Sequence, residues 1–268
     1  MAQALPDLTN VFNLEEHETD TYVGESPDYS WGRIYGGLVV AQALWAATQT
    51  VNPEHLIHSL HAYFILGGDL PEPVRYEVDR IRNGRSFSTR RVVARQNRGA
   101  ILTLECSFHV FEPGPEAQAA QFPADVTVPD ENHDEVDAGI LCAPGADNLD
   151  PPRSAVWARY PLPLGDDPRL HACGLAYLSD LNPTGAVMRC HPAPMTGNDL
   201  DDGGVMSASL DHALWFHRPG RADAWTLLDL TGHSFVGSRG LATGLMFGAD
   251  GTHLATIAQD VLIRDRRN

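Results

Sequence analysis

Two polar side chains stand out because the residues around each would bury it. Asp211 lies between Leu210 and Leu214 in a stretch typical of a strand, and Gln259 shares its strand face with apolar residues only. A carboxylate buried without a cation is a stronger base, and a buried amide needs hydrogen-bond partners. Asp211 is therefore a candidate general base, and Gln259 is a buried polar group that requires a specific partner. The structural alternatives are an ion pair of Asp211 with His212 or an arginine, and a backbone hydrogen bond for Gln259.

Other chemistries are less well supported. Gly36 and Gly37 precede an apolar helix, whose first N–H groups suit a carbonyl oxygen. The chain has no lysine, which excludes Schiff-base catalysis, and no Gly-x-Ser-x-Gly motif, which disfavours a serine hydrolase. His58 and His61 are three residues apart on an expected strand and would point to opposite faces, so no metal site is expected.

The charge of the chain limits its partners. A formal net charge of -16 over 268 residues argues against nucleic acid, which requires a basic surface. Seven of the 19 basic residues nevertheless gather between residues 80 and 98. A solvated, arginine-rich strand pair explains this cluster best; the alternative is an anion site, with Arg90 as a substrate contact.

The expected compartment is the cytoplasm. The four cysteines show no C-x-x-C spacing, and the first residues lack the basic and apolar regions of a signal peptide. No apolar run is long enough to cross a membrane, so no stable membrane insertion is expected.

The elements that would position these residues form two similar sets. An apolar helix over 37–50 is followed by strands near 57–66, 74–82, 86–96 and 100–111. A short strand near 155–160 and a helix near 169–181 are followed by strands near 204–217, 225–231, 233–246 and 252–264. Each set predicts an α+β unit in which an antiparallel sheet curls around one buried helix.

A faint internal repeat supports two such units. Ser59-Leu60 recurs 150 positions later as Ser209-Leu210, and Gly84–Arg90 resembles Gly232–Arg239. The turn at 97–99 likewise corresponds to the turn at 249–251. Residues 113–152 are rich in proline and acid, without periodicity, and predict a linker. The expected domains are therefore 1–112 and 153–268.

Several segments together resemble the double hot-dog acyl-CoA thioesterase II (TesB-like) family, over roughly 31–111 and 170–265. They are Tyr35–Leu44, His58–Phe64, Asn83–Val92, Ser209–His217 and Ser238–Gly240. The resemblance implies a tandem double hot-dog, hydrolysis of acyl-CoA to free acid and CoA, no cofactor and no covalent intermediate. In this family an Asp, a Thr or Ser, and a Gln hold the attacking water. The Asp corresponds to Asp211 and the Gln to Gln259.

The chain departs from the family at the hydroxyl residue. Counting back from Ser238-Arg239-Gly240 places that residue at His233, with Ser234 beside it. Either Ser234 supplies the hydroxyl or His233 replaces it as a base, and His233 is favoured because it aligns without a gap. Neighbouring strand residues point to opposite faces, so only one of the two would reach the water.

Two other functions remain open from the sequence. One is a double hot-dog enoyl-thioester hydratase that uses Asp211 and His233, and the other is a weakly active acyl-CoA-binding protein. In each case acyl-CoA is the expected partner. Because sheet edges need cover, a homo-oligomer is also expected.

Overall fold

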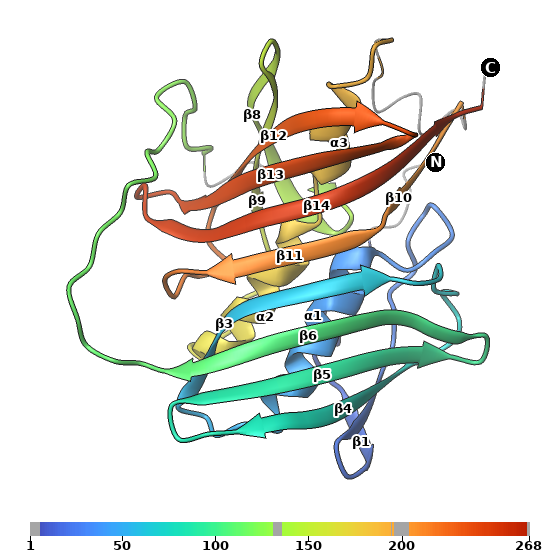
Figure 1. The fold of residues 1–268 in the computed structure, drawn as a ribbon, viewed down its shortest axis with the longest axis vertical. Coiled ribbons are helices and arrows are strands. Elements are labelled where there is room, and N and C mark those ends of the chain that lie inside the picture. The colour runs from blue at the N-terminus through green and yellow to red at the C-terminus, as the bar shows by residue number, and fades with distance from the viewer. Residues whose placement is uncertain (1–5, 131–135, 194, 196–203, 267–268) are drawn as a thin grey trace.

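The apolar stretch that begins at Gly36 forms the helix α1, Gly36–Thr48, at the centre of the protein (Figure 1). Eleven of its 13 residues are buried, as its all-apolar sequence predicts. The computed structural model describes residues 6–130, 136–193, 195 and 204–266.

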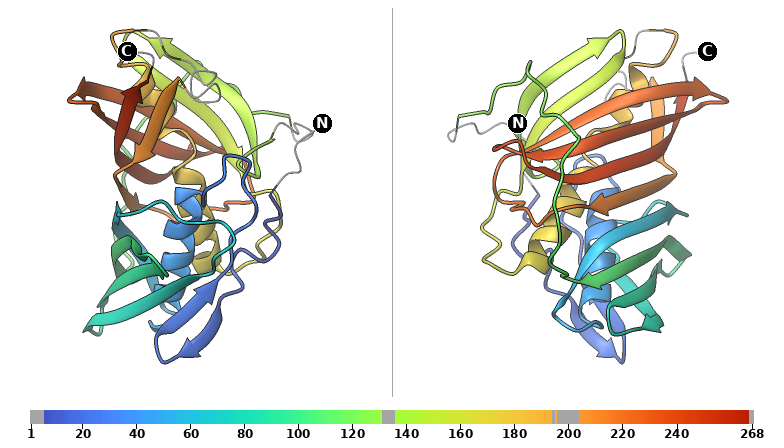
Figure 2. Two further views of the ribbon diagram at one scale, coloured as in Figure 1. Left: turned by 90° about the vertical axis from the view of Figure 1, so that its right-hand side faces the viewer. Right: turned by 60° about the vertical axis from the view of Figure 1, so that its left-hand side comes forward.

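One large antiparallel sheet surrounds the helices. In the first half its strands are β1 (Glu15–Glu18), β2 (Thr21–Gly24), β3 (His55–Phe64), β4 (Val74–Asn83), β5 (Phe87–Gln96) and β6 (Gly99–Val110). In the second half they are β7 (Val136–Asp137), β8 (Ile140–Leu149), β9 (Pro152–Arg159), β10 (Val205–Ser209), β11 (Asp211–Phe216), β12 (Thr226–Val236), β13 (Arg239–Gly248) and β14 (His253–Asp265). The strand order is β1-β2-β4-β5-β6-β3-β11-β14-β13-β12-β9-β8-β7, and β10 pairs with β14. The ends of the sheet curve back toward the helices (Figure 2).

The two halves meet where β3 pairs with β11. His212 lies opposite Ala62 in this register, and these two positions are separated by the same 150 residues as the sequence repeat. A two-fold relation between the halves therefore passes close to this pair. This pairing joins the two halves into one sheet.

The helices also pack against each other. The second long helix, α2 (Pro168–Ser179), lies beside α1 (Figure 1). A Cβ at Gly37 would be only 2.5 Å from the carbonyl oxygen of Tyr177, so only glycine permits this approach. The hydroxyl of Tyr35 donates to the same oxygen at 3.1 Å. A short helix, α3 (Pro183–Met188), follows α2.

The segment expected to be a linker is only partly one. Residues 113–130 contain no helix or strand, but β7 and β8 lie within the expected linker range. Pro144 and a register irregularity after it interrupt the alternation of β8, which explains why no strand pattern is visible in the sequence.

The boundary expected between strands at residue 232 was also wrong. β12 continues to Val236, and a two-residue turn at Gly237-Ser238 connects it to β13. Both turn residues have positive φ, 59° and 60°, as a tight hairpin requires. Gly232 instead lies at a bulge, so it is not the structural counterpart of Gly84, which turns the chain between β4 and β5.

Arg90 has a structural place in the fold. The residue is 1% exposed, and its five N–H donors contact Thr50, Asn83 and the carbonyl oxygens of Arg82 and Thr89. The side chain therefore ties β5 to the loop after α1 and keeps no donor for a substrate. Other arginines of the cluster pair with acids on the sheet surface, as Arg80 does with Asp20.

Within the described ranges, no helix is both long and apolar enough to cross a membrane.

Replacing Arg90 with methionine should destabilise the protein by about 2–4 kcal/mol, because it leaves several buried oxygens without donors. Urea unfolding followed by circular dichroism measures this loss. Arg82→Met is the matched control: its side chain is exposed, so a change within about 0.5 kcal/mol is expected. Equal effects in the two variants would contradict the structural role.

Candidate active site

Gln259 anchors a buried polar cluster on the helix side of the sheet. Its side chain is 1% exposed, as expected from its apolar strand face. The amide oxygen accepts from Nδ1 of His212 at 2.6 Å, and the amide nitrogen donates to Oγ of Ser209 at 2.8 Å. The other ring nitrogen of His212 lies 2.8 Å from the hydroxyl of Ser179. The partners of Gln259 are thus side chains that can themselves exchange hydrogen bonds, not backbone groups.

A carboxylate from the end of α2 completes this cluster. Ser209 donates to Oδ1 of Asp180 at 3.3 Å, and the N–H of Gly37 and the amide of Gln259 also bond to this carboxylate. Burial raises the pKa of Asp180, while the charge of His212 and these hydrogen bonds oppose part of the rise. The pKa of Asp180 is therefore closer to neutral pH than that of an exposed carboxyl group.

Asp211 lies beside the cluster, at an irregularity between β10 and β11. Its Oδ1 accepts from the backbone N–H of Asp260 at 2.8 Å, and the N–H of Leu210 donates to the Asp260 carbonyl oxygen. The carboxylate thus substitutes for a backbone acceptor where the strand ladder is broken. Asp211 is only half-buried, and among the described residues its side chain makes no hydrogen bond to Gln259.

His233 and Ser234 are both exposed. His233 occupies the bulge in β12, and its Nε2 lies 2.6 Å from the hydroxyl of Thr243 on the neighbouring strand. Two strand spacings, or roughly 10 Å, separate β12 from β14, which carries Gln259. Within the described part of the chain, neither residue contacts Asp211 or Gln259.

The glycines at the start of α1 let the polar cluster approach the helix. A Cβ at Gly36 would lie 2.6 Å from Oδ2 of Asp180. Among the first N–H groups of α1, which were expected to suit a carbonyl oxygen, that of Gly37 bonds to this carboxylate. Negative charge at a helix N-terminus is favourable, so the same place suits an oxyanion.

Sequence reasoning missed Asp180, Ser209 and His212 as members of the site. Asp180 follows the last helical residue of α2 and resembles an ordinary polar end of a helix. Ser209 was visible only as part of the repeat, and His212 only as a possible partner of Asp211. Asp180 and Ser209 each lie at the end of an element. Polar residues at such ends are the signal that could have made them candidates.

The arrangement fits general acid–base chemistry on a water molecule. It combines a carboxyl group with a raised pKa, an imidazole, an orienting amide, and helix N–H groups that favour negative charge. Ser179 and Ser209 supply the hydroxyls among these groups. Ser179 bonds to His212, but the other ring nitrogen of His212 bonds to the Gln259 amide and not to a carboxylate, so these groups do not form a nucleophilic triad.

Comparisons with known proteins agree with this chemistry. A family model for the N-terminal domain of acyl-CoA thioesterases matches residues 26–109, and one for the C-terminal domain matches residues 112–263. Acyl-coenzyme A thioesterase 8 of Rattus norvegicus is 32% identical over 97% of this chain and 89% of its own length. The acyl-CoA thioesterase II TesB2 of Mycobacterium marinum superposes with a TM-score of 0.79 at 35% identity, covering 96% of each chain. A hot-dog protein from Alicyclobacillus acidocaldarius, 18% identical, has a TM-score of 0.75 over 95% of this chain and 97% of its own, and shares the fold.

The raised pKa of Asp180 predicts a pH-dependent gain from Asp180→Asn. Above pH 3.8, the usual pKa, the unfolded chain ionises before the folded one, so folded-state stability falls until the pH passes the folded pKa. Asparagine resembles the neutral acid and avoids this loss. The difference in unfolding free energy between variant and wild type should therefore increase in favour of the variant from pH 4 to pH 7.

Urea unfolding at a series of pH values measures this difference. Asp166→Asn is the control, because the Asp166 side chain is 99% exposed. A difference for Asp180→Asn that does not change with pH would show that its carboxyl group is not perturbed.

Proposed function

We infer how the site works from the fact that this chain belongs to the acyl-CoA thioesterase family. It hydrolyses acyl-CoA thioesters. In this reaction the oxygen of a water molecule bonds to the acyl carbon while a base takes its proton. The C–S bond then breaks, and the CoA thiolate receives a proton. The family match favours this reaction over hydration of an enoyl thioester.

We propose that Gln259 orients the water and that Asp211 is its base. The observation that carries this proposal is the hydrogen-bonded cluster around Gln259, which places an amide beside the start of α1 in otherwise apolar surroundings. Asp211 precedes His212, which bonds to this amide, but the two side chains leave β11 on opposite faces. To reach the cluster, the Asp211 carboxylate must leave the Asp260 N–H and turn at the irregularity between β10 and β11. The N–H groups after Gly36 would then stabilise the charge on the thioester oxygen.

Asp180 is a second candidate for the base. Unlike Asp211, it already bonds to Ser209 and Gln259, and its raised pKa is nearer to the value that general-base catalysis at neutral pH requires. Its contact with the N–H of Gly37 must then break when the thioester oxygen binds there.

For the family's hydroxyl position, we propose that His233 rather than Ser234 acts on the reaction. The choice rests on the sequence, in which His233 aligns with this position without a gap. Its imidazole contacts Thr243, which points to the sheet face opposite to Ala242, the residue that pairs with Gln259 across β13 and β14. Reaching the water requires β12 to shift at its bulge, which is the least constrained point of that strand.

We also propose that the chain is a tandem double hot-dog, with units at 1–112 and 153–268. Support comes from the pairing of Ala62 with His212 at the repeat offset, and from one long helix in each half. The exposed Tyr63 and Trp215 lie on the strands that join the halves, and we propose that a homo-oligomer covers them. The four free cysteines suit the reducing cytoplasm.

Asp211→Asn and Gln259→Ala should each lower kcat by on the order of 10²–10⁴, because each removes a group that orients or deprotonates the water. Thiol release from an acyl-CoA panel measures turnover. Asp79→Asn is the control, since Asp79 is paired with Arg91 on the far side of the first half. If Asp211→Asn folds and keeps wild-type turnover while Asp180→Asn loses it, Asp180 is the base instead.

His233→Ala and Ser234→Ala test the remaining position. If the imidazole serves as a base, wild-type activity rises as the ring loses its proton, and His233→Ala loses both rate and this dependence. Thiol release from about pH 5.5 to 9 compares the two variants. Loss of activity only in Ser234→Ala, with the pH profile of His233→Ala unchanged, would assign the role to the hydroxyl.

A further inference from the structure

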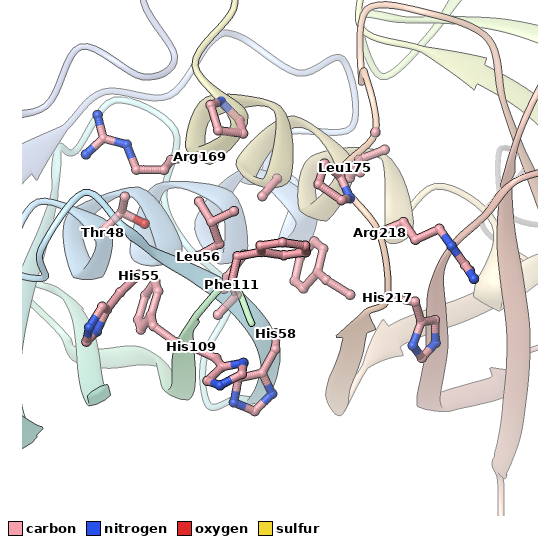
Figure 3. Close-up of a pocket in the computed structure, with 17 residues that line it drawn as sticks. Thr48, His55, Leu56, His58, His109, Phe111, Arg169, Leu175, His217 and Arg218 are labelled. Atoms are coloured by element: carbon pink, nitrogen blue, oxygen red, sulfur yellow. The ribbon is translucent and has the colours of Figure 1, made fainter. Parts of the chain in front are cut away.

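A cavity of about 180 Å³ lies at the opposite end of the helix pair from Gln259. It is bounded by the C-terminus of α1, the first turns of α2, the ends of β3 and β6, and the turn after β11 (Figure 3). Residues from both halves of the chain line it. His217, just beyond β11, belongs to this cavity, while Asp211 begins that strand. The six residue-to-residue steps from Asp211 to His217 span about 20 Å, so the two sites are separate.

The cavity occupies the position that the internal repeat relates to the Gln259 cluster. The turns that precede β6 and β14 are 152 residues apart, and the cavity lies at the start of α2 as the Gln259 cluster lies at the start of α1. Ser107 bonds to Nε2 of His58 at 2.8 Å, but it lies on the face of β6 opposite to the buried Cys106, whereas Gln259 is buried, so Ser107 is not the counterpart of Gln259. The wall carries no equivalent of the Gln259 amide or the Asp180 carboxylate. The second end thus keeps a cavity but lacks the hydrolytic groups.

The lining suits an apolar chain. Leu56, Phe111, Leu175 and Phe216 form much of its surface, and Phe111 extends across the middle of the opening (Figure 3). The exposed fraction of Phe111 is 72%, which is costly for a large apolar side chain without a partner.

The charge of the lining is opposite to that of the protein. Among the described residues, those that line the cavity include four histidines and two arginines and no acidic residue, although acids outnumber basic residues in the chain by 35 to 19. Arg218 donates to the carbonyl oxygens of Ala117 and His253, and its bridge to Glu116, whose side chain is 72% exposed, is long at 3.6 Å, so its charge is only weakly neutralised. Arg169 pairs with Asp167 at the cap of α2. His58 and His109 lie side by side (Figure 3), and His109 is bridged to Glu112 at 3.5 Å. Burial and the neighbouring His109 lower the pKa of His58.

We propose that this cavity is a second, non-hydrolytic binding site for a fatty acyl chain that carries an anionic head group. The chain packs against Phe111, Leu175 and Phe216, and the head group lies at the rim near Arg218. Free fatty acid, the product of the reaction, and acyl-CoA, its substrate, share this chemistry. The choice of an acyl ligand rests on the hydrolysis of acyl-CoA, but the site does not require Asp211 or Gln259 to be catalytic.

Equilibrium dialysis of labelled decanoate, and of the non-hydrolysable thioether S-decyl-CoA, tests the site in the full-length protein. Ala172→Phe places a bulky ring in the cavity from α2 and should weaken binding at least about tenfold. Arg218→Gln removes the rim charge without altering the apolar wall and should weaken binding about threefold to tenfold. Arg98→Gln, at an exposed turn, is the control and should have no effect.

The ligands and variants distinguish the outcomes. Weaker binding of decanoate in the cavity variants identifies free acid as the occupant, and weaker binding of S-decyl-CoA alone identifies the thioester; both support the site. Binding of both ligands that is unchanged in Ala172→Phe and Arg218→Gln, or lost only in Gln259→Ala, would overturn it. If Ala172→Phe does not fold, Arg218→Gln decides. Wild-type turnover in Gln259→Ala would contradict the proposed catalytic roles without affecting this result.

Discussion

The close packing of α1 against α2 is the constraint on which the rest of the structure depends. Gly37 has no room for a side chain beside the Tyr177 carbonyl oxygen, so the two helices approach at backbone distance. Their side-by-side contact brings the start of α1 to the end of α2. One continuous sheet can then cover both helices, because β3 and β11 pair directly above the helix contact. Without this contact, each half would expose an apolar helix face.

The polar cluster follows from the same packing. Four N–H groups at the start of a helix have no partner within the helix, and the buried start of α1 cannot use water freely. Asp180, at the end of α2, supplies a carboxylate there, and Ser209 and Gln259 bond to that carboxylate in turn. A chain of groups that satisfies a buried helix end is also one that can hold a water and an oxyanion. The groups that stabilise the buried start of α1 are therefore also the groups proposed to bind the water and the oxyanion.

The sequence was sufficient for features that depend on periodicity. The all-apolar run of α1 and the apolar strand face around Gln259 predicted a buried helix and a buried amide, and the structure confirms both. It was insufficient where a residue's role depends on its neighbours in space. Arg90 was expected to be solvated, or else an anion contact, but it is buried and two of its five hydrogen bonds go to Thr50, 40 residues earlier in the chain. Asp180 was overlooked for the converse reason, because its partners lie on three other elements.

The two ends of the helix pair differ in their hydrogen bonds. At one end Asp180, Ser209 and Gln259 link α2, β10 and β14, so hydrogen bonds fill the space between the elements. At the other end Thr48 returns its hydroxyl to its own helix, and Ser107 bonds to His58 on the adjacent strand. No polar group there bridges helix and sheet among the residues that line the cavity, and the space remains open. A cavity is therefore retained where the bridging carboxylate is absent, and chemistry is concentrated where it is present.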